Sequence, residues 1–73
     1  MNVYPNPTNG VLNINSKSSI ITINITDLNG RLIQASNQNN NQVAINVENL
    51  QSGIYLLKIT TESGVSTQKI IKE

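Results

Sequence analysis

The 73-residue sequence contains no cysteine, histidine, tryptophan or phenylalanine. Without cysteine and histidine, the chain cannot form a disulfide and lacks the common zinc ligands, the cysteine nucleophile and the histidine general base. Its only aromatic residues, Tyr4 and Tyr55, are too few for a platform on which the bases of single-stranded nucleic acid would stack. These absences argue against a zinc enzyme, a disulfide-stabilised domain and a binder of single-stranded nucleic acid.

Charge is also scarce, because charged residues make up 12% of the chain and the net charge is +1. The five cationic residues are spread from Lys17 to Lys72 and form no cluster in the sequence. Binding several phosphates requires such a cluster of Lys and Arg. We therefore expect no nucleic-acid partner.

The acidic residues occur singly in the sequence. They are Asp27, Glu48, Glu62 and Glu73. Catalysis by carboxylates of the glycosidase type needs two of them facing each other across a cleft, for which a chain of this length has little room. A calcium loop needs several neighbouring carboxylates, whereas Asp27 has no second acid near it and is typical of a residue that caps a turn. We expect no enzymatic activity, no cofactor and no metal site.

The residues that are abundant favour a small β domain. Asn occurs thirteen times and Ile eleven times, and β-branched Ile, Val and Thr together account for 22 residues. Such residues favour strands over helices. The length allows a single domain, residues 1–73. No apolar run approaches the roughly 20 residues that span a bilayer, and no signal peptide is recognisable, so we expect no membrane insertion and place any export signal upstream.

Alternation of apolar and polar residues predicts six strands, at 11–15, 20–26, 31–36, 43–48, 54–61 and 65–72, and a short strand at 3–4. Tight turns are predicted at 27–30 and 62–64, a left-handed or type I′ turn at Asn9-Gly10, a polar connection at 16–19 and an exposed all-amide loop at 37–42. The spacing of about 8–12 residues is typical of a sandwich or a small barrel. The residues predicted to point inward are Leu12, Ile14, Ile21, Ile23, Ile25, Val43, Ile45, Val47, Leu50, Tyr55, Leu57 and Ile59.

Four segments, in order and at these spacings, resemble the motifs of one family. The opening motif is residues 3–10 (VYPNPTNG), the middle motif is 27–32 (DLNGRL), the third is 50–59 (LQSGIYLLKI), and the closing motif is Gly64 followed by 69–72 (KIIK). Together they resemble the type A C-terminal sorting domain of the type IX secretion system of Bacteroidetes, over essentially the whole chain from Val3 to Glu73. The resemblance implies an immunoglobulin-like β-sandwich of about seven short antiparallel strands, in agreement with the strand prediction.

The resemblance also implies a non-catalytic role in secretion. Such a domain is the last part of a larger cargo protein and directs that cargo from the periplasm across the outer membrane to the cell surface or the medium. The implied partners are the upstream cargo domain and the secretion machinery, namely an outer-membrane translocon, a shuttle protein and a sortase-like peptidase. In many cases the peptidase removes the domain and joins the cargo to a surface lipopolysaccharide.

The resemblance separates residues that form the fold from residues that contact partners. The family-motif residues expected to form the fold are Pro5, Pro7, Gly10, Asp27, Gly30, Arg31, Leu50, Gly53, Tyr55 and Gly64. Among them, the two prolines are expected to stiffen the junction with the cargo. Partner contact is expected in the last hairpin, from Ile54 to Glu73, by strand addition or by capture of the terminal carboxylate. The residues expected to make it are Lys69, Ile70, Ile71, Lys72 and Glu73, with Lys69 and Lys72 as the polar contacts. The same lysines also suit an edge strand that avoids aggregation.

Two other functions remain open from the sequence. A small immunoglobulin-like adhesion or carbohydrate-binding module would use exposed amides and hydroxyls, although the chain has few aromatic residues on which sugars could stack. A structural cap for an upstream domain would need no site of its own.

Overall fold

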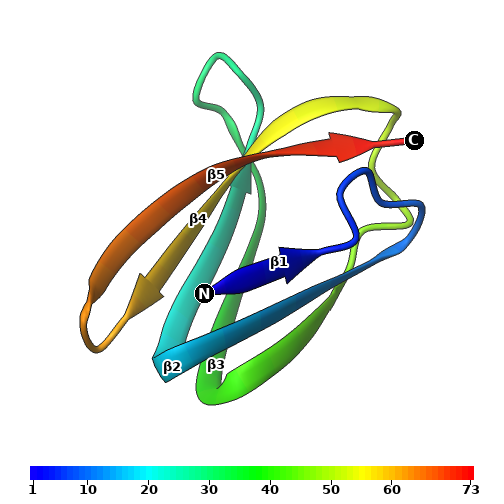
Figure 1. Cartoon of the computed structure of the whole chain (residues 1–73). Helices are drawn as coiled ribbons and strands as arrows, with labels where there is room; N and C mark the ends of the chain where they lie inside the picture. Colours follow the sequence, from blue (N-terminus) through cyan, green and yellow to red (C-terminus); the bar gives the residue numbers. More distant parts are fainter.

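The computed structural model describes all 73 residues as an all-β domain without a helix (Figure 1). No helix is therefore long and apolar enough to cross a membrane. The five strands are β1 (Asn2–Tyr4), β2 (Val11–Thr26), β3 (Leu32–Asn46), β4 (Gly53–Thr61) and β5 (Gly64–Lys72).

The long strand β2 is the centre of the fold. All strand pairs are antiparallel, in the order β1-β2-β4-β5, and β3 pairs with the other edge of β2. The first part of β2, residues 13–15, pairs with β1, whereas its second part, residues 20–26, pairs with β4. Figure 1 shows β2 and β3 bending together, so that one long hairpin contributes to both layers of an immunoglobulin-like sandwich.

The predicted all-β fold is confirmed, but two predicted connections are wrong. Residues 16–19 and 37–42 lie inside β2 and β3, which reduces the expected seven strands to five. The chain bends here, with shifts in the β2–β3 register. The Asn41 side chain ties the bend together, because its Nδ2 donates to the carbonyl oxygens of Ser16 and Lys17 at 3.3 and 2.9 Å. An exposed strand needs no apolar residue, and amide side chains supply the hydrogen bonds that a bent ladder loses.

The core consists of twelve buried apolar residues from β2, β3, β4, β5 and the connection after β3. They are Leu12, Ile14, Ile20, Ile23, Ile25, Val43, Ile45, Val47, Leu50, Leu57, Ile59 and Ile70. Ten of the positions predicted to point inward lie in this core, and Tyr55 packs half-buried against it. The period of two therefore identified the inner face of nearly every strand.

One inward prediction, Ile21, is wrong. Ile20 pairs with Thr61 and Thr22 pairs with Thr60, so two steps along β2 correspond to one step along β4. Ile21 is the extra residue of this β-bulge. Beyond the bulge the alternation is shifted by one residue, so the side chains that point inward change from even-numbered to odd-numbered positions. Ile20 is completely buried as a result, and the side chain of Ile21 is 45% exposed.

The hairpin between β2 and β3 closes as predicted, through a capped turn. One carboxylate oxygen of Asp27, Oδ1, accepts hydrogen bonds from the backbone N–H groups of Asn29 and Arg31, both at 2.9 Å. The other, Oδ2, lies 3.3 Å from Nε of Arg31. Gly30 has a φ of 88°, a conformation that disfavours residues with a Cβ.

The predicted left-handed turn at Asn9-Gly10 is wrong, because the residues with positive φ do not include either of them. Gly10 serves close packing instead. A Cβ on Gly10 would lie 2.9 Å from Cγ of Glu48, so the absence of a side chain makes room for the chain that follows β3.

Candidate functional site

The four motifs, apart from Gly64, meet at one end of the sandwich. Thr8 in the opening motif forms a parallel bridge with Lys72 in the closing motif, and Lys72 is also opposite Gly53 in the third motif. Thr26, which precedes the middle motif, is opposite Leu56 of the third. Figure 1 shows the loops after β1 and β3 near the end of β5, and the β2–β3 turn projecting at the top of the view; all three lie away from the β4–β5 turn. We call this the motif end.

At the motif end, the opening motif covers the free edge of β5. Asn6 Nδ2 donates to the carbonyl oxygen of Lys69 at 3.1 Å, and Asn6 Oδ1 accepts from the N–H of Ile71 at 3.0 Å. The backbone of Thr8 donates to Ile71 O and accepts from the N–H of Glu73, both at 2.9 Å. These four hydrogen bonds occupy the outward backbone groups from the carbonyl oxygen of Lys69 to the N–H of Glu73. An additional strand cannot pair there without displacing the opening motif.

Pro5 and Pro7 lie inside the domain, on either side of Asn6. Because β1 precedes both prolines and pairs with β2, their predicted role in a junction ahead of the domain is wrong. They shape the loop that carries Asn6 and Thr8 to the edge of β5.

Strand alternation divides the five residues predicted to contact a partner. Ile70 and Lys72 are buried, and Lys72 is only 8% exposed. The Nζ of Lys72 donates to the carbonyl oxygen of Glu73 at 3.1 Å. Lys69, Ile71 and Glu73 are exposed. Partner contact by this strand stays a prediction, and the side chains available for it are those three.

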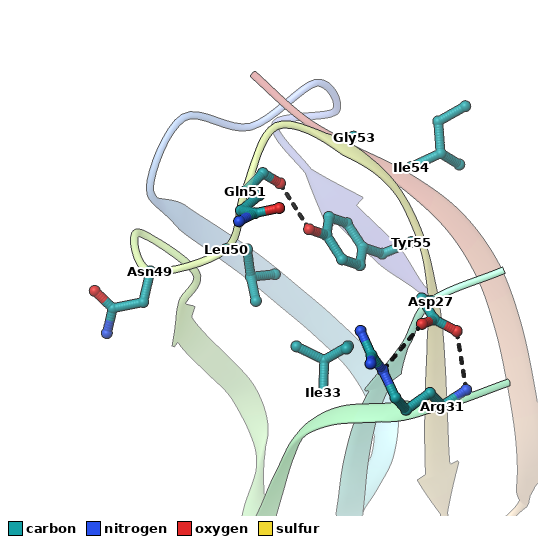
Figure 2. Close-up of a pocket in the computed structure, with 9 residues that line it drawn as sticks. All are labelled: Asp27, Arg31, Ile33, Asn49, Leu50, Gln51, Gly53, Ile54 and Tyr55. Carbon is teal, nitrogen blue, oxygen red and sulfur yellow. Dashed lines mark hydrogen bonds and ion pairs between the residues drawn. The ribbon is translucent and has the colours of Figure 1, made fainter. Parts of the chain in front are cut away.

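A pocket of about 420 Å³ lies between the middle and third motifs (Figure 2). Figure 2 shows the Tyr55 ring beside Gln51 and facing the Asp27–Arg31 pair. The Tyr55 hydroxyl donates to the carbonyl oxygen of Gln51 at 2.7 Å, which fixes the corner before β4. The residues that line the pocket are Asp27, Arg31, Ile33, Asn49, Leu50, Gln51, Gly53, Ile54 and Tyr55.

The pocket offers binding groups rather than a reactive pair. Asp27 is its only acid, and both of its oxygens already have partners in the turn. The Tyr55 hydroxyl is likewise engaged. The side chain of Arg31 is 79% exposed, and only its Nε contacts Asp27. No group of three or more acidic, His or Cys side chains lies together in the chain to hold a metal ion.

Two contributions to the motif end were missed by sequence reasoning. Asn6 was not singled out, because its hydrogen-bond partners lie more than 60 residues away and no local pattern identifies them. The cross-strand pair of Ile54 and Ile71 was also missed, since it depends on the register between β4 and β5. The only local indication of the role of Asn6 was the pair of prolines that flank it. Proline has no backbone N–H, so this segment has few backbone donors with which to pair with a strand edge.

Comparison with known proteins agrees with the motifs. A family model described as a secretion system C-terminal sorting domain matches residues 2–73 of the chain. No curated protein matches the sequence.

Proposed function

The chain belongs to the family of secretion-system C-terminal sorting domains, and on this basis we propose that it directs an attached cargo protein across the outer membrane as a non-catalytic signal. The sorting role follows from membership of the family, because these domains are C-terminal sorting signals of the type IX secretion system. The observation that carries the proposal is the match over 72 of the 73 positions, residues 2–73.

We further propose a route, a set of partners and a fate for the domain. The cargo lies ahead of this domain in a larger protein and passes through the periplasm before reaching the surface or the medium. An outer-membrane translocon, a shuttle protein and a sortase-like peptidase recognise the domain. The peptidase can remove the domain and attach the cargo to a surface lipopolysaccharide. These parts are supported by the resemblance of the four motifs to those of the type A sorting domain.

The arrangement of the domain suits recognition better than catalysis. A signal that is read by another protein needs a stable, distinctive surface, and the motif end concentrates exposed side chains from the middle, third and closing motifs. Catalysis would need a nucleophile with an adjacent base, whereas Asp27 and Tyr55 in the pocket are engaged in turn contacts.

A secretion assay tests this function. A fluorescent passenger with an export signal would carry residues 1–73 at its C-terminus, in a bacterium with a working type IX system. The matched controls are the passenger alone and the same fusion in a strain that lacks the translocon. We expect the fusion at the surface or in the medium only when both the domain and the system are present. Retention of the fusion in the periplasm of the competent strain would contradict the proposal, and glycan screening of the purified domain would then test the adhesion alternative.

A further inference from the structure

Exposed branched apolar side chains form a continuous patch on the outer face of β4 and β5 at the motif end. Ile54 and Ile71 are directly opposite each other, and they are 44% and 39% exposed. Directly opposite residues share a face of the sheet with their Cβ atoms about 4.5–5.5 Å apart. Figure 2 shows the Ile54 side chain on the other side of β4 from the Tyr55 ring. The pair therefore faces away from the core.

The patch continues onto the next strands. Leu56, two residues after Ile54 and on the same face, is half-buried and lies opposite Lys69 on β5 and Thr26 on β2. Thr26 in turn lies opposite Leu32, which is exposed. Scattered apolar residues are normal at a protein surface, but neighbours across several strands are typical of an interaction surface.

The charge around this patch has one predominant sign. Lys69 lies beside Leu56, and Lys58 is the next outward residue on β4. Of the acidic residues, Asp27 is paired with Arg31 in the adjacent turn. Glu48 and Glu62 lie in the connections before and after β4. Glu73, two residues after Ile71, is the one acidic residue on the face that Lys69 and Ile71 share. The two lysines outnumber it and favour a partner that carries carboxylates.

The covered edge of β5 limits how a partner can bind this region. Four backbone groups of residues 69–73 that face away from β4 are bonded to Asn6 and Thr8. A partner therefore meets the side chains on the outer face and not an open strand edge. Two copies of the domain would bring their lysines together on this face, which disfavours self-association through it.

We propose that the outer face of β4 and β5 at the motif end docks onto a folded protein surface that presents apolar side chains bordered by carboxylates. This proposal rests on the proposed function and places that surface on the secretion machinery that binds the domain. The docking surface is defined by Ile54, Leu56 and Ile71 with Lys58 and Lys69. Its apolar centre supplies the binding free energy, and its lysines orient the approach of the partner.

The test is the secretion assay with substitutions that keep strand propensity. The double variant Ile54→Thr/Ile71→Thr removes the apolar centre. The matched control, Ile21→Thr/Val65→Thr, changes two exposed residues away from the motif end. We expect the secreted amount to fall about tenfold or more for the first variant, as is typical when central anchor residues are lost. The control should be secreted like the unmodified fusion.

Circular dichroism and thermal unfolding of the purified domains establish that each variant folds. Should Ile54→Thr/Ile71→Thr fail to fold, the charge variant Lys58→Glu/Lys69→Glu carries the test, with Lys17→Glu as its control. All three lysines are exposed. We expect the charge variant to be retained and Lys17→Glu to be secreted.

Each result separates this proposal from the proposed function. Failure of the unmodified fusion to leave the periplasm overturns the sorting function itself. Normal secretion of the unmodified fusion and of the folded Ile54→Thr/Ile71→Thr or charge variant overturns only the docking surface. Equal retention of a variant and its control overturns it too, because the effect would not depend on this region. If the unmodified domain is a dimer and the Ile54→Thr/Ile71→Thr variant is a monomer, the occupant of this surface is a second copy of the chain. That result also contradicts the proposal.

Discussion

Asn6 is the residue whose chemistry best explains the opening motif. Its side-chain amide carries both a donor and an acceptor, as a peptide group does. Pro5 and Pro7 on either side have no backbone N–H, so the main chain of this segment can offer few donors to a neighbouring strand. The Asn6 amide bonds Lys69 O and Ile71 N instead, and the edge of β5 is covered by a side chain where the backbone could not cover it.

Replacement of Asn6 by Ala should therefore lower the free energy of unfolding. Two exposed hydrogen bonds are lost, which corresponds to about 1–2 kcal/mol. Urea unfolding measures this change, and faster amide exchange at Ile71 would locate it on the strand. Asn9→Ala is the control, because Asn9 is exposed and makes no side-chain hydrogen bond. Equal stability of the two variants would show that the Asn6 contacts contribute nothing.

The β-bulge in β2 decides which of two consecutive isoleucines belongs to the core. Without it, a strict period of two would place Ile21, Ile23 and Ile25 on one face. The extra residue opposite Thr60 and Thr61 turns Ile20 inward and Ile21 outward. One strand can therefore bend between the two layers and still bury an apolar side chain on each side of the bend.

The bulge predicts very different effects for the same substitution at adjacent positions. Ile20→Ala removes a fully buried side chain and should cost about 2–5 kcal/mol of stability. Ile21→Ala removes an exposed one and should change stability by only about 0.5 kcal/mol. Thermal or urea unfolding of both variants, side by side, checks this difference. If Ile21→Ala were the more damaging substitution, the bulge would lie elsewhere in β2.

The opening motif and the last strand, at the two ends of the chain, contact each other. The opening motif saturates the edge of β5, and β5 contributes Ile70 to the core. The middle and third motifs share the pocket beside this contact. A domain of 73 residues is expected to have a free energy of unfolding of only about 4–11 kcal/mol, so the loss of one such contact region affects the whole fold.

Deletion of residues 69–73 should consequently abolish cooperative unfolding of the isolated domain. It removes the buried Ile70 and Lys72 and all four hydrogen bonds to the opening motif. Circular dichroism melting and proton NMR dispersion would measure the loss. A truncated domain that still melts cooperatively would contradict this expectation. Loss of secretion after such a deletion would report unfolding as much as recognition, and surface substitutions are the cleaner probe.

Local patterns were sufficient for much of this protein. Alternation identified the inward faces of Val43, Ile45, Leu57 and Ile59, and Asp27 was recognised as a turn residue. The motifs indicated the family, which the match over residues 2–73 confirms. These features depend on residues close together in the sequence, whose side-chain period and turn chemistry can be evaluated directly.

Other features depend on pairs of residues far apart in the chain. The bulge at Ile21 follows from the register with β4, and the covered edge of β5 follows from contacts between Asn6 and residues 63 and 65 positions later. The predicted polar connections became strands because β2 and β3 pair along their length. Register and edge coverage arise only when the whole sheet closes around one core, because each pairing depends on where the others leave an open edge.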